Sequence, residues 1–405
     1  MLRCVLIVLF LYSGILSEQY KLKFSVVVWR HGDRTPITSY PGNQNKDSWL
    51  LPPGQLTTIG MKQHYDLGRY LRKRYAGFIS EYYLKNETYI ISDLEDRTIE
   101  SALSNMAGLF PPKDWQSFDE KLPWQPIPIH TPSSAAEYIS LPWEKCDSWL
   151  LEYSKIKSTE EYDAALRSAE PIFEVLFNKT GIHYNLDNLA MLTDVFICED
   201  AHKLRHPPWF NELNFTKMTD LAAFRMEKLF GTKRAQQIIA GPLLYHIRHA
   251  IIETVLLRKN SRKLLAFSGH DTNIASLSLL LGIFNYRLPT YASVLFFEVY
   301  ANVDLEYFLK ISIRNSSSEE PFTLKMPFCK HLEYCPLQKF LNLSEKYAKE
   351  DFWHNCISKA DVETQYHLFA MTRVAFGLLF VVLTILLVVV VKINLEPQRV
   401  IFEKL

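Results

Sequence analysis

A histidine and two arginines follow directly after an apolar run near the start of the chain. The run from Phe24 to Trp29 is β-branched and aromatic, which is typical of a buried strand, and glycine and proline turn the chain just after it. Arg30, His31 and Arg34 are therefore predicted to lie on a loop at the strand's carboxyl end. Ligands bind at this edge in open α/β sheets, and arginine can donate two parallel hydrogen bonds to a phosphate. This cluster predicts an anion site.

Two later segments repeat the order of apolar strand, polar exit and helix. The strand Thr88 to Ser92 leads to Arg97, and the strand Leu264 to Phe267 leads to His270 and Asp271. If the strand ends are neighbours, the arginines can hold phosphate oxygens and offset the charge of the transition state. One histidine can attack phosphorus, and a carboxylic acid can protonate the departing alcohol. The set is complete for phosphate ester hydrolysis without a metal.

The charges around the histidine predict the pH dependence of this chemistry. Arginines favour a neutral imidazole by repelling its proton, whereas an aspartic acid starts from a pKa of ~3.9. His31 would stay nucleophilic as the pH falls and Asp271 becomes protonated. We therefore expect activity that rises below neutral pH.

Other histidines could in principle bind a metal. His246 and His249 are three residues apart on a predicted helix, but no carboxylate is placed with them, so a structural role is favoured. His202 and His206 are interpreted as cap or surface residues. No metal or other cofactor is predicted.

Three more side chains near these motifs have open roles. Asp33 is expected to orient the loop arginines and is given no catalytic step. Trp143 and Trp149 could line a pocket, although packing in the core is the favoured interpretation.

Strands that alternate with helices predict an α/β fold with a mainly parallel central sheet flanked by helices on both sides. Helical patterns are expected at 56–75, 98–110 and 274–281, and a hairpin from Val294 to Ile313 with Asn302 near its turn. A helical cap, at about residues 115–240, is expected as an insertion between the second and third strand units.

The two ends of the chain predict a membrane protein that enters the secretory route. Residues 1–17 have the form of a signal peptide, with a short N-terminal anchor as the rival interpretation. Residues 18–366 would form the luminal or extracellular part, and 367–391 one transmembrane helix around the charge-free run 374–391. Residues 392–405 would be a cytosolic tail, because its cations fit the positive-inside preference. This is a single-pass type I topology.

Composition agrees with a large globular domain outside the cytosol. The chain has 405 residues, 48% hydrophobic content and a formal net charge of +1, which gives no bulk charge to attract nucleic acid. Six cysteines are present, and the odd number left after signal removal requires one thiol outside the intramolecular disulfides. Five sequons mark candidate glycosylation sites at Asn86, Asn178, Asn214, Asn315 and Asn342.

The segment Arg30-His31-Gly32-Asp33-Arg34-Thr35-Pro36 resembles the signature of the histidine acid phosphatases, and Gly269-His270-Asp271 resembles their second motif. The resemblance extends through Gly54-Gln55-Leu56-Thr57, Asp96-Arg97-Thr98 and Trp124-Gln125-Pro126-Ile127-Pro128. Within this family the animal prostatic, lysosomal and testicular types are the most similar, and the terminal membrane span resembles the last two.

The resemblance implies a role for each motif residue. His31 would be the nucleophile that forms a phosphohistidine, and Asp271 would be the proton donor. The phosphate would be bound by Arg30, Arg34, Arg97 and His270. The family also implies an α/β body with a helical cap, a pocket between these two layers, homodimers, and no metal.

The resemblance further implies two disulfides, Cys146 with Cys356 and Cys329 with Cys335, which would leave Cys198 unpaired. Five residues separate Cys329 from Cys335, where the family has three. The tail lacks the tyrosine of the lysosomal sorting signal, so a lysosomal or endosomal location and the cell surface both stay open.

The main prediction is a membrane-anchored acid phosphatase for phosphate monoesters, either small molecules or proteins. A phosphate-binding ectodomain without turnover and a narrow phosphosugar phosphatase are the alternatives. The sequence does not rank lipid phosphates, nucleotides, phosphosugars and phosphoproteins as substrates.

Overall fold

The computed structural model describes residues 20–140, 143–316 and 319–351, together with Cys356 and parts of the segment 371–389. The chain divides into two compact units, Met1–His354 and Asn355–Leu405. The predicted signal peptide and cytosolic tail lie outside the described residues, as does part of the predicted membrane span. Among the helices that the structure does describe, none combines the length and the apolar character needed to cross a bilayer.

The first unit is built on a seven-stranded sheet with the order β2-β3-β1-β4-β5-β6, and β7 pairs with β5. The strands are β1 (Lys21–Arg30), β2 (Thr88–Ser92), β3 (Leu264–Gly269), β4 (Val294–Ala301), β5 (Tyr307–Arg314), β6 (Phe322–Leu324) and β7 (Cys335–Pro336).

The sheet is mixed, so the prediction of a mainly parallel sheet was wrong. Only β2, β3 and β1 are parallel neighbours, whereas β4 runs antiparallel to β1 and the strands beyond it stay antiparallel. The predicted hairpin causes this, because β4 and β5 are joined by a short turn at Asn302 and must run in opposite directions. The three strands that carry the motifs are nevertheless the parallel ones.

Strand β1 is central and buried on both faces. Phe24, Val26 and Val28 point into one core cluster, and Val27 and Trp29 point into another, as the alternation of side chains along a strand requires. Its near-continuous apolar sequence therefore reflects two covered faces.

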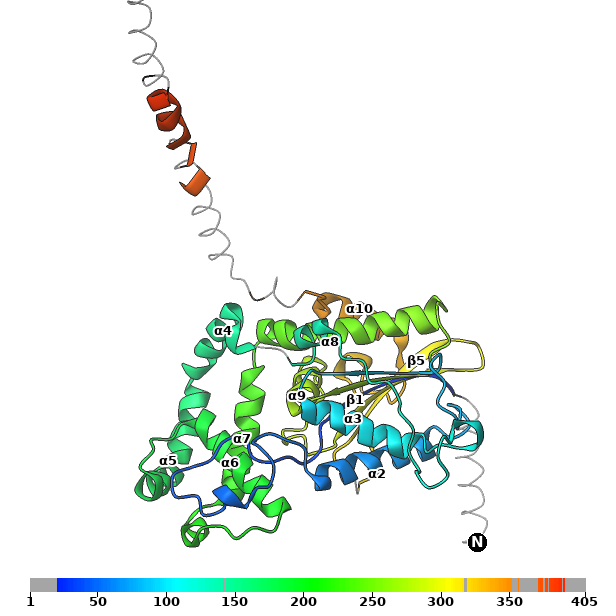
Figure 1. Cartoon of the computed structure of the whole chain (residues 1–405), viewed down its shortest axis with the longest axis horizontal. Coiled ribbons are helices and arrows are strands. Elements are labelled where there is room, and N and C mark those ends of the chain that lie inside the picture. The colour runs from blue at the N-terminus through cyan, green and yellow to red at the C-terminus, as the bar shows by residue number, and fades with distance from the viewer. Residues whose placement is uncertain are drawn as a thin grey trace, which may run out of the picture. The chain divides into compact units, whose positions relative to one another are not determined.

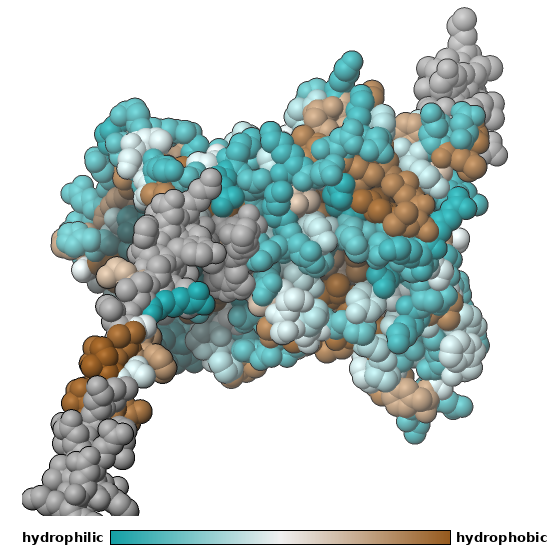
Figure 2. Space-filling model, turned by 90° about the horizontal axis from the view of Figure 1, so that it is seen from above, coloured by the Kyte–Doolittle hydropathy of each residue, from teal (hydrophilic) through white to brown (hydrophobic). Residues whose placement is uncertain are grey.

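Helices cover both faces of the sheet, as predicted (Figure 1). On one face lie α2 (Thr58–Arg74) and α3 (Asp96–Leu109), and on the other lie α8 (Lys233–Ile251), α9 (Asp271–Leu280) and α10 (Leu337–Tyr347). The predicted helices at 56–75, 98–110 and 274–281 correspond to α2, α3 and α9 within a few residues. Seen from the side of α8 and α10, the surface is largely hydrophilic with separate apolar patches (Figure 2).

Four more helices form a cap at one end of this body: α4 (Asp147–Lys157), α5 (Glu160–Thr180), α6 (Leu186–Ala201) and α7 (Phe215–Leu229) (Figure 1). Residues of α5, α6 and α7 share a core cluster of their own, which includes Leu176, Val195, Phe196 and Leu221. The helical insertion between β2 and β3 thus has its own hydrophobic core.

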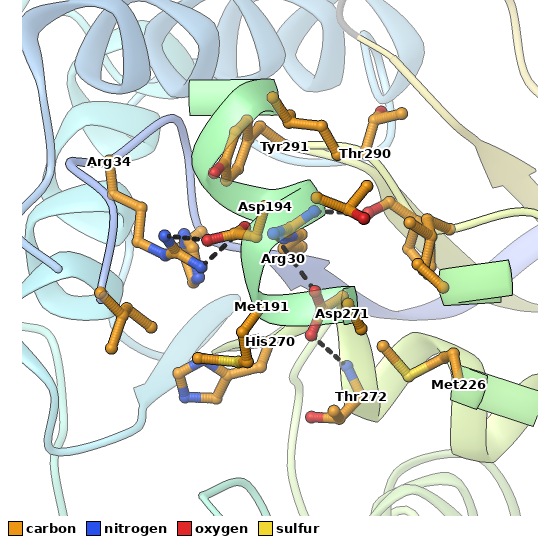
Figure 3. A pocket seen from close by; sticks show the side chains of 18 of the residues that line it. Arg30, Arg34, Met191, Asp194, Met226, His270, Asp271, Thr272, Thr290 and Tyr291 are labelled. Carbon is orange, nitrogen blue, oxygen red and sulfur yellow. Dashed lines mark hydrogen bonds and ion pairs between the residues drawn. The ribbon is translucent and has the colours of Figure 1, made fainter. Parts of the chain in front are cut away.

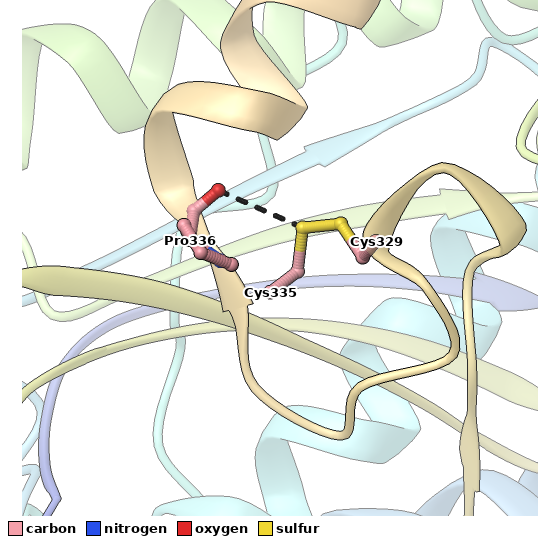
Figure 4. The surroundings of a disulfide bond; sticks show 3 residues. All are labelled: Cys329, Cys335 and Pro336. Atoms are coloured by element: carbon pink, nitrogen blue, oxygen red, sulfur yellow. Dashed lines mark hydrogen bonds between the residues drawn. A yellow bond between two sulfur atoms is a disulfide. The ribbon is translucent and has the colours of Figure 1, made fainter.

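The disulfide Cys329–Cys335 closes a loop beside β5, with 5.4 Å between the Cα atoms (Figure 4). Cys146 and Cys356 are also disulfide-bonded, and Cys198 is a buried free thiol. The bridge Cys329–Cys335 is one of the two that the family resemblance implied.

Close helix packing fixes the position of α2. Gly68 on α2 and Gly108 on α3 each face the backbone of the other helix, and a Cβ at Gly68 would overlap the carbonyl oxygen of Asn105. The two helices can approach this closely only because these positions lack side chains.

We expect Gly68→Ala to lower the free energy of unfolding by about 1–3 kcal/mol, the usual cost of overpacking. Without a clash, alanine would stabilise the helix by about 1 kcal/mol relative to glycine. A lower free energy of unfolding in the variant would therefore indicate overpacking. Urea unfolding of the purified protein measures it, with Arg69→Ala at the adjacent exposed position as control. Equal or greater stability of Gly68→Ala would contradict the packing argument.

Candidate active site

The carboxyl ends of β1, β2 and β3 are adjacent, which brings the three motifs together. Arg30 pairs in register with Gly269, and Ser92 with Ser268, so each strand delivers its loop to the same edge. A cavity of about 400 Å³ opens there. All six residues predicted to act on phosphate line it: Arg30, His31, Arg34, Arg97, His270 and Asp271.

His31 is buried, and its backbone is hydrogen-bonded to the end of β3 and to the loop before β4. Its backbone N–H donates to Gly269 at 2.8 Å, and its carbonyl accepts from Ala292 at 3.1 Å. The ring Nδ1 lies 2.7 Å from the carbonyl oxygen of Gly32. Because a carbonyl can only accept, Nδ1 carries the proton, and in the neutral ring Nε2 therefore keeps its lone pair.

The nucleophile loop packs against the start of α2 without room for side chains. A Cβ at Gly32 would overlap the backbone of Gly60. Asp33, which is fully buried, accepts hydrogen bonds from Thr57 and, at 2.8 Å, contacts Nε2 of His202 from the cap. Asp33 therefore joins the loop to the start of α2 and to the cap, and His202 is a contact between cap and body.

Arg30 lies at the centre of the cavity (Figure 3). Its guanidinium donates to the carbonyl oxygen of Pro289 at 2.6 Å and pairs with Asp271 at 3.2 Å. It also lies 4.2 Å from the ring centroid of Tyr291, which adds a cation–π contact. These contacts fix its direction before any ligand binds.

Arg34 is held by the cap. Both of its terminal nitrogens donate to the carboxylate of Asp194 on α6, each at 3.0 Å, in a bidentate pair (Figure 3). The buried thiol of Cys198, one turn further along α6, lies 3.7 Å from the same guanidinium. Burial alone would lower the pKa of Arg34, but Asp194 raises it well above its ordinary value.

Arg97 lines the same cavity and pairs with the more exposed Glu95 at 3.0 Å. The buried Nε atoms of Arg30, Arg34 and Arg97 make no hydrogen bond to any residue that the structure describes. A phosphate offers acceptor oxygens, so its chemistry fits this donor set.

His270 and Asp271 are positioned by the start of α9. Nε2 of His270 contacts Asp93 at 2.7 Å, and Asp93 also accepts a hydrogen bond from Ser140. One carboxylate oxygen of Asp271 accepts from the backbone N–H of Thr272 at 2.8 Å, and the other faces Arg30. Burial would raise the pKa of Asp93, but His270 outweighs it and the pKa is lowered.

Burial and the charges around the cavity give His31 and Asp271 different protonation states. Burial first, then the charges of Arg30 and His270, lower the pKa of His31 well below its usual value. Burial would raise the pKa of Asp271, yet Arg30 and His270 outweigh it and the pKa is lowered. The free site therefore holds a neutral imidazole opposite an ionised carboxylate.

Sequence reasoning missed several residues of the site. Asp93, directly after β2, was not given its role as partner of His270. Asp194 was not singled out, although it is a lone charge within the apolar stretch Leu189 to Cys198, and such a charge signals a buried partner. Nothing in the sequence around Tyr291 marks it as a site residue, because only the tertiary fold brings the loop before β4 to Arg30.

The structure also places the tryptophans and the α8 histidines that the sequence analysis considered for a pocket or a metal site. Trp143 lines the cavity, while Trp149 is buried and donates to the carbonyl oxygen of Leu229 at 2.8 Å. On α8, His246 packs on Tyr138 and His249 faces Glu253. Within the described residues, no group of three or more histidine, cysteine or acidic side chains is placed to hold a metal ion.

The fold and the site define a histidine phosphatase. Residues 21–320 match the model of the histidine phosphatase superfamily (branch 2), and the chain belongs to this family. The resemblance of its motifs to the histidine acid phosphatases is thereby confirmed, and family membership makes the chain a phosphoric monoester hydrolase.

Its curated relatives are named acid phosphatases. A lysosomal acid phosphatase of Xenopus laevis is 33% identical over 94% of this chain and 90% of the relative. A prostatic acid phosphatase of Bos taurus is 35% identical over 83% of this chain and 88% of the relative. The similarity therefore extends over nearly the whole length of both proteins.

Solved structures share the fold at low identity. A phytase of Hafnia alvei in complex with myo-inositol hexakis sulphate aligns over 84% of this chain and 99% of its own, at 18% identity and a TM-score of 0.66. A phytase of Citrobacter braakii aligns over 84% of this chain and all of its own, at 20% identity and a TM-score of 0.63.

We expect the His31 imidazole to stay neutral at pH 5 in the ligand-free protein, because burial and the surrounding arginines lower its pKa. An ordinary histidine, with a pKa of about 6.5, would be largely protonated there. NMR of histidine-labelled protein measures this, with the His31→Ala variant assigning the signal. Protonation of His31 at or above pH 6 would contradict the electrostatic argument.

Proposed function

We propose that the protein hydrolyses phosphate monoesters by transferring the phosphoryl group to Nε2 of His31 and then to water. The observation that carries this proposal is the hydrogen bond from Nδ1 of His31 to Gly32, which leaves the Nε2 lone pair of the neutral ring as the nucleophile in a cavity lined by arginines. Arg30, Arg97 and His270 would bind the phosphoryl oxygens, with Arg34 beside them.

In the first step, the Nε2 lone pair forms a bond to phosphorus while the bond from phosphorus to the ester oxygen breaks. Asp271 gives its proton to that oxygen, so that an alcohol and not an alkoxide departs. The guanidinium groups offset the charge on the equatorial oxygens, a contribution typical of phosphoryl transfer sites.

In the second step, water attacks the phosphohistidine and the ionised Asp271 accepts its proton. The bond between phosphorus and Nε2 breaks, which leaves His31 neutral and Asp271 protonated, as they were before the first step. When phosphate leaves, Asp271 releases the proton that substrate binding had taken up, and the free site is restored. The two roles of one carboxyl group follow from microscopic reversibility.

Substrate binding prepares Asp271 for its acid role. In the free site Arg30 holds the carboxyl ionised. A phosphate dianion that binds Arg30 brings negative charge beside the carboxylate, and this raises the pKa of Asp271. Binding should therefore take up a proton, which mildly acidic conditions favour.

We expect His31→Ala to abolish hydrolysis of every monoester and to prevent labelling by ³²P-phosphoryl substrate after an acid-free quench. Asp271→Asn should slow alkyl phosphates by about 10²–10⁴-fold, the usual contribution of a general acid. The same variant should lower kcat/KM for p-nitrophenyl phosphate much less, because that leaving group needs no proton and kcat/KM does not include the second step, in which Asp271 acts as base.

The control is His183→Ala at an exposed histidine of the cap, which should keep wild-type rates. Residual turnover in His31→Ala equal to that of wild type would rule out the phosphohistidine route. An equal loss of kcat/KM for both substrates in Asp271→Asn would rule out the acid role of that residue.

We also propose that the enzyme follows the secretory route and is anchored by one transmembrane helix at 367–391. The charge-free run between Arg373 and Lys392 and the lysosomal names of relatives support this. Asn86, Asn178, Asn214 and Asn342 are exposed, as glycosylation requires, and Asn315 is partly exposed. The choice between lysosome and cell surface, and the homodimer implied by the family, stay predictions.

We expect full-length protein expressed in animal cells to stay in the membrane pellet after alkaline carbonate extraction. A chain that stops at residue 366 should instead appear in the medium with its phosphatase activity, because the anchor is removed. Glycosidase-sensitive mass should be found in both forms. Extraction of the full-length protein into the soluble fraction would contradict the anchor.

A further inference from the structure

The cavity has two unlike walls. The wall at the strand ends is cationic, with Arg30, Arg97 and His270. The cap supplies an apolar wall, because the side chains that α6 and α7 turn into the cavity include two methionines (Figure 3). Its residues are Met191, Ala222, Met226 and Leu229, with Ile37 and Trp143 beside them.

Met191 is the most exposed of the apolar side chains that the cap helices α6 and α7 contribute to this wall. It is 39% exposed, whereas Met226 is 7% exposed. An apolar group that covers Met191 removes apolar surface from water, which is favourable by about 25 cal/mol per Å². Methionine is also unbranched and polarisable, so it adapts to an aliphatic chain or to an aromatic ring.

The charges around the cavity do not favour a second anionic group. The lining contains four arginines (Arg30, Arg34, Arg97 and Arg225) and four acidic residues (Asp93, Glu95, Asp194 and Asp271). Each of these arginines also has a carboxylate partner, which for Arg225 is Asp187 at 2.8 Å. One phosphate can use the strand-end donors, but further phosphates would meet partnered cations and carboxylates.

We propose that the wall formed by Met191 and Met226 is the leaving-group subsite, and that it selects monoesters of uncharged, apolar alcohols over polyanionic esters. The inference rests on the proposed function, because it assumes that the phosphoryl group lies at the strand ends. The alcohol then extends toward the cap, where the cavity volume is that of an ordinary small-molecule site.

Straight-chain alkyl phosphates test this subsite, because ethyl, butyl and hexyl phosphate have nearly equal leaving groups. We expect kcat/KM to rise by up to about fourfold for each methylene that is buried, until the cavity is filled. Benzyl phosphate, compared with hexyl phosphate, shows whether a ring or a chain fits better. Glycerol 1-phosphate and inositol hexakisphosphate should be poorer substrates than butyl phosphate.

Variants at Met191 locate the effect. Met191→Gln keeps the length of the side chain but makes it polar, so the ratio of kcat/KM between hexyl and ethyl phosphate should fall toward one. Met191→Leu should retain most of that ratio. The matched control is Met61→Gln, because Met61 lies on α2 outside the cavity and is 38% exposed, and its ratio should equal that of wild type.

The outcomes separate the two proposals. If wild type hydrolyses all alkyl phosphates equally, or inositol hexakisphosphate faster than butyl phosphate, the subsite is refuted while the phosphatase activity stands. A rising series that Met191→Gln leaves unchanged also refutes it. If wild type hydrolyses no member of the panel, the proposed function itself fails.

Discussion

The burial of several cations at one sheet edge is the constraint on which the rest of the structure depends. Arg30, Arg34 and Arg97 lie around one small cavity, and like charges in a poorly solvated site repel one another. The chain meets this cost with one carboxylate for each guanidinium, from Asp271, Asp194 and Glu95. The partners come from three different elements, so the site is complete only when sheet, cap and loops are assembled.

The cap is therefore part of the active site as well as a cover for it. Helix α6 provides Asp194 to Arg34, and just beyond its end His202 contacts Asp33 in the nucleophile loop. Both contacts reach residues that follow directly after β1, namely Asp33 and Arg34. Displacement of α6 would remove the carboxylate partner of the buried Arg34 and the His202 contact of the buried Asp33, and loss of the partner of a buried charge is among the more costly changes that a folded protein can undergo.

The sequence predicted which residues share the cavity better than it predicted the architecture of the sheet. The six phosphate-site residues follow apolar strands, and the order of strand, turn and helix is a local pattern that places them at one edge. The direction of β4 relative to β1 is not determined by a local sequence pattern, because the hairpin could have joined the sheet elsewhere. The prediction of a mainly parallel sheet was wrong for this reason. Asp194 and Met191 were missed for a related reason: helical spacing shows which residues share a face of α6, but not what that face meets.

Cys198 is the odd thiol of a chain whose other described cysteines are in disulfides. Burial raises the pKa of its thiol to about 12. Disulfide exchange requires a thiolate, and at neutral pH such a thiol is ionised in only about one molecule in 10⁵. Once α6 has packed in place, the Cys198 thiol therefore stays protonated and does not attack disulfides. The folded protein can thus contain an unpaired cysteine without disulfide exchange at Cys329–Cys335.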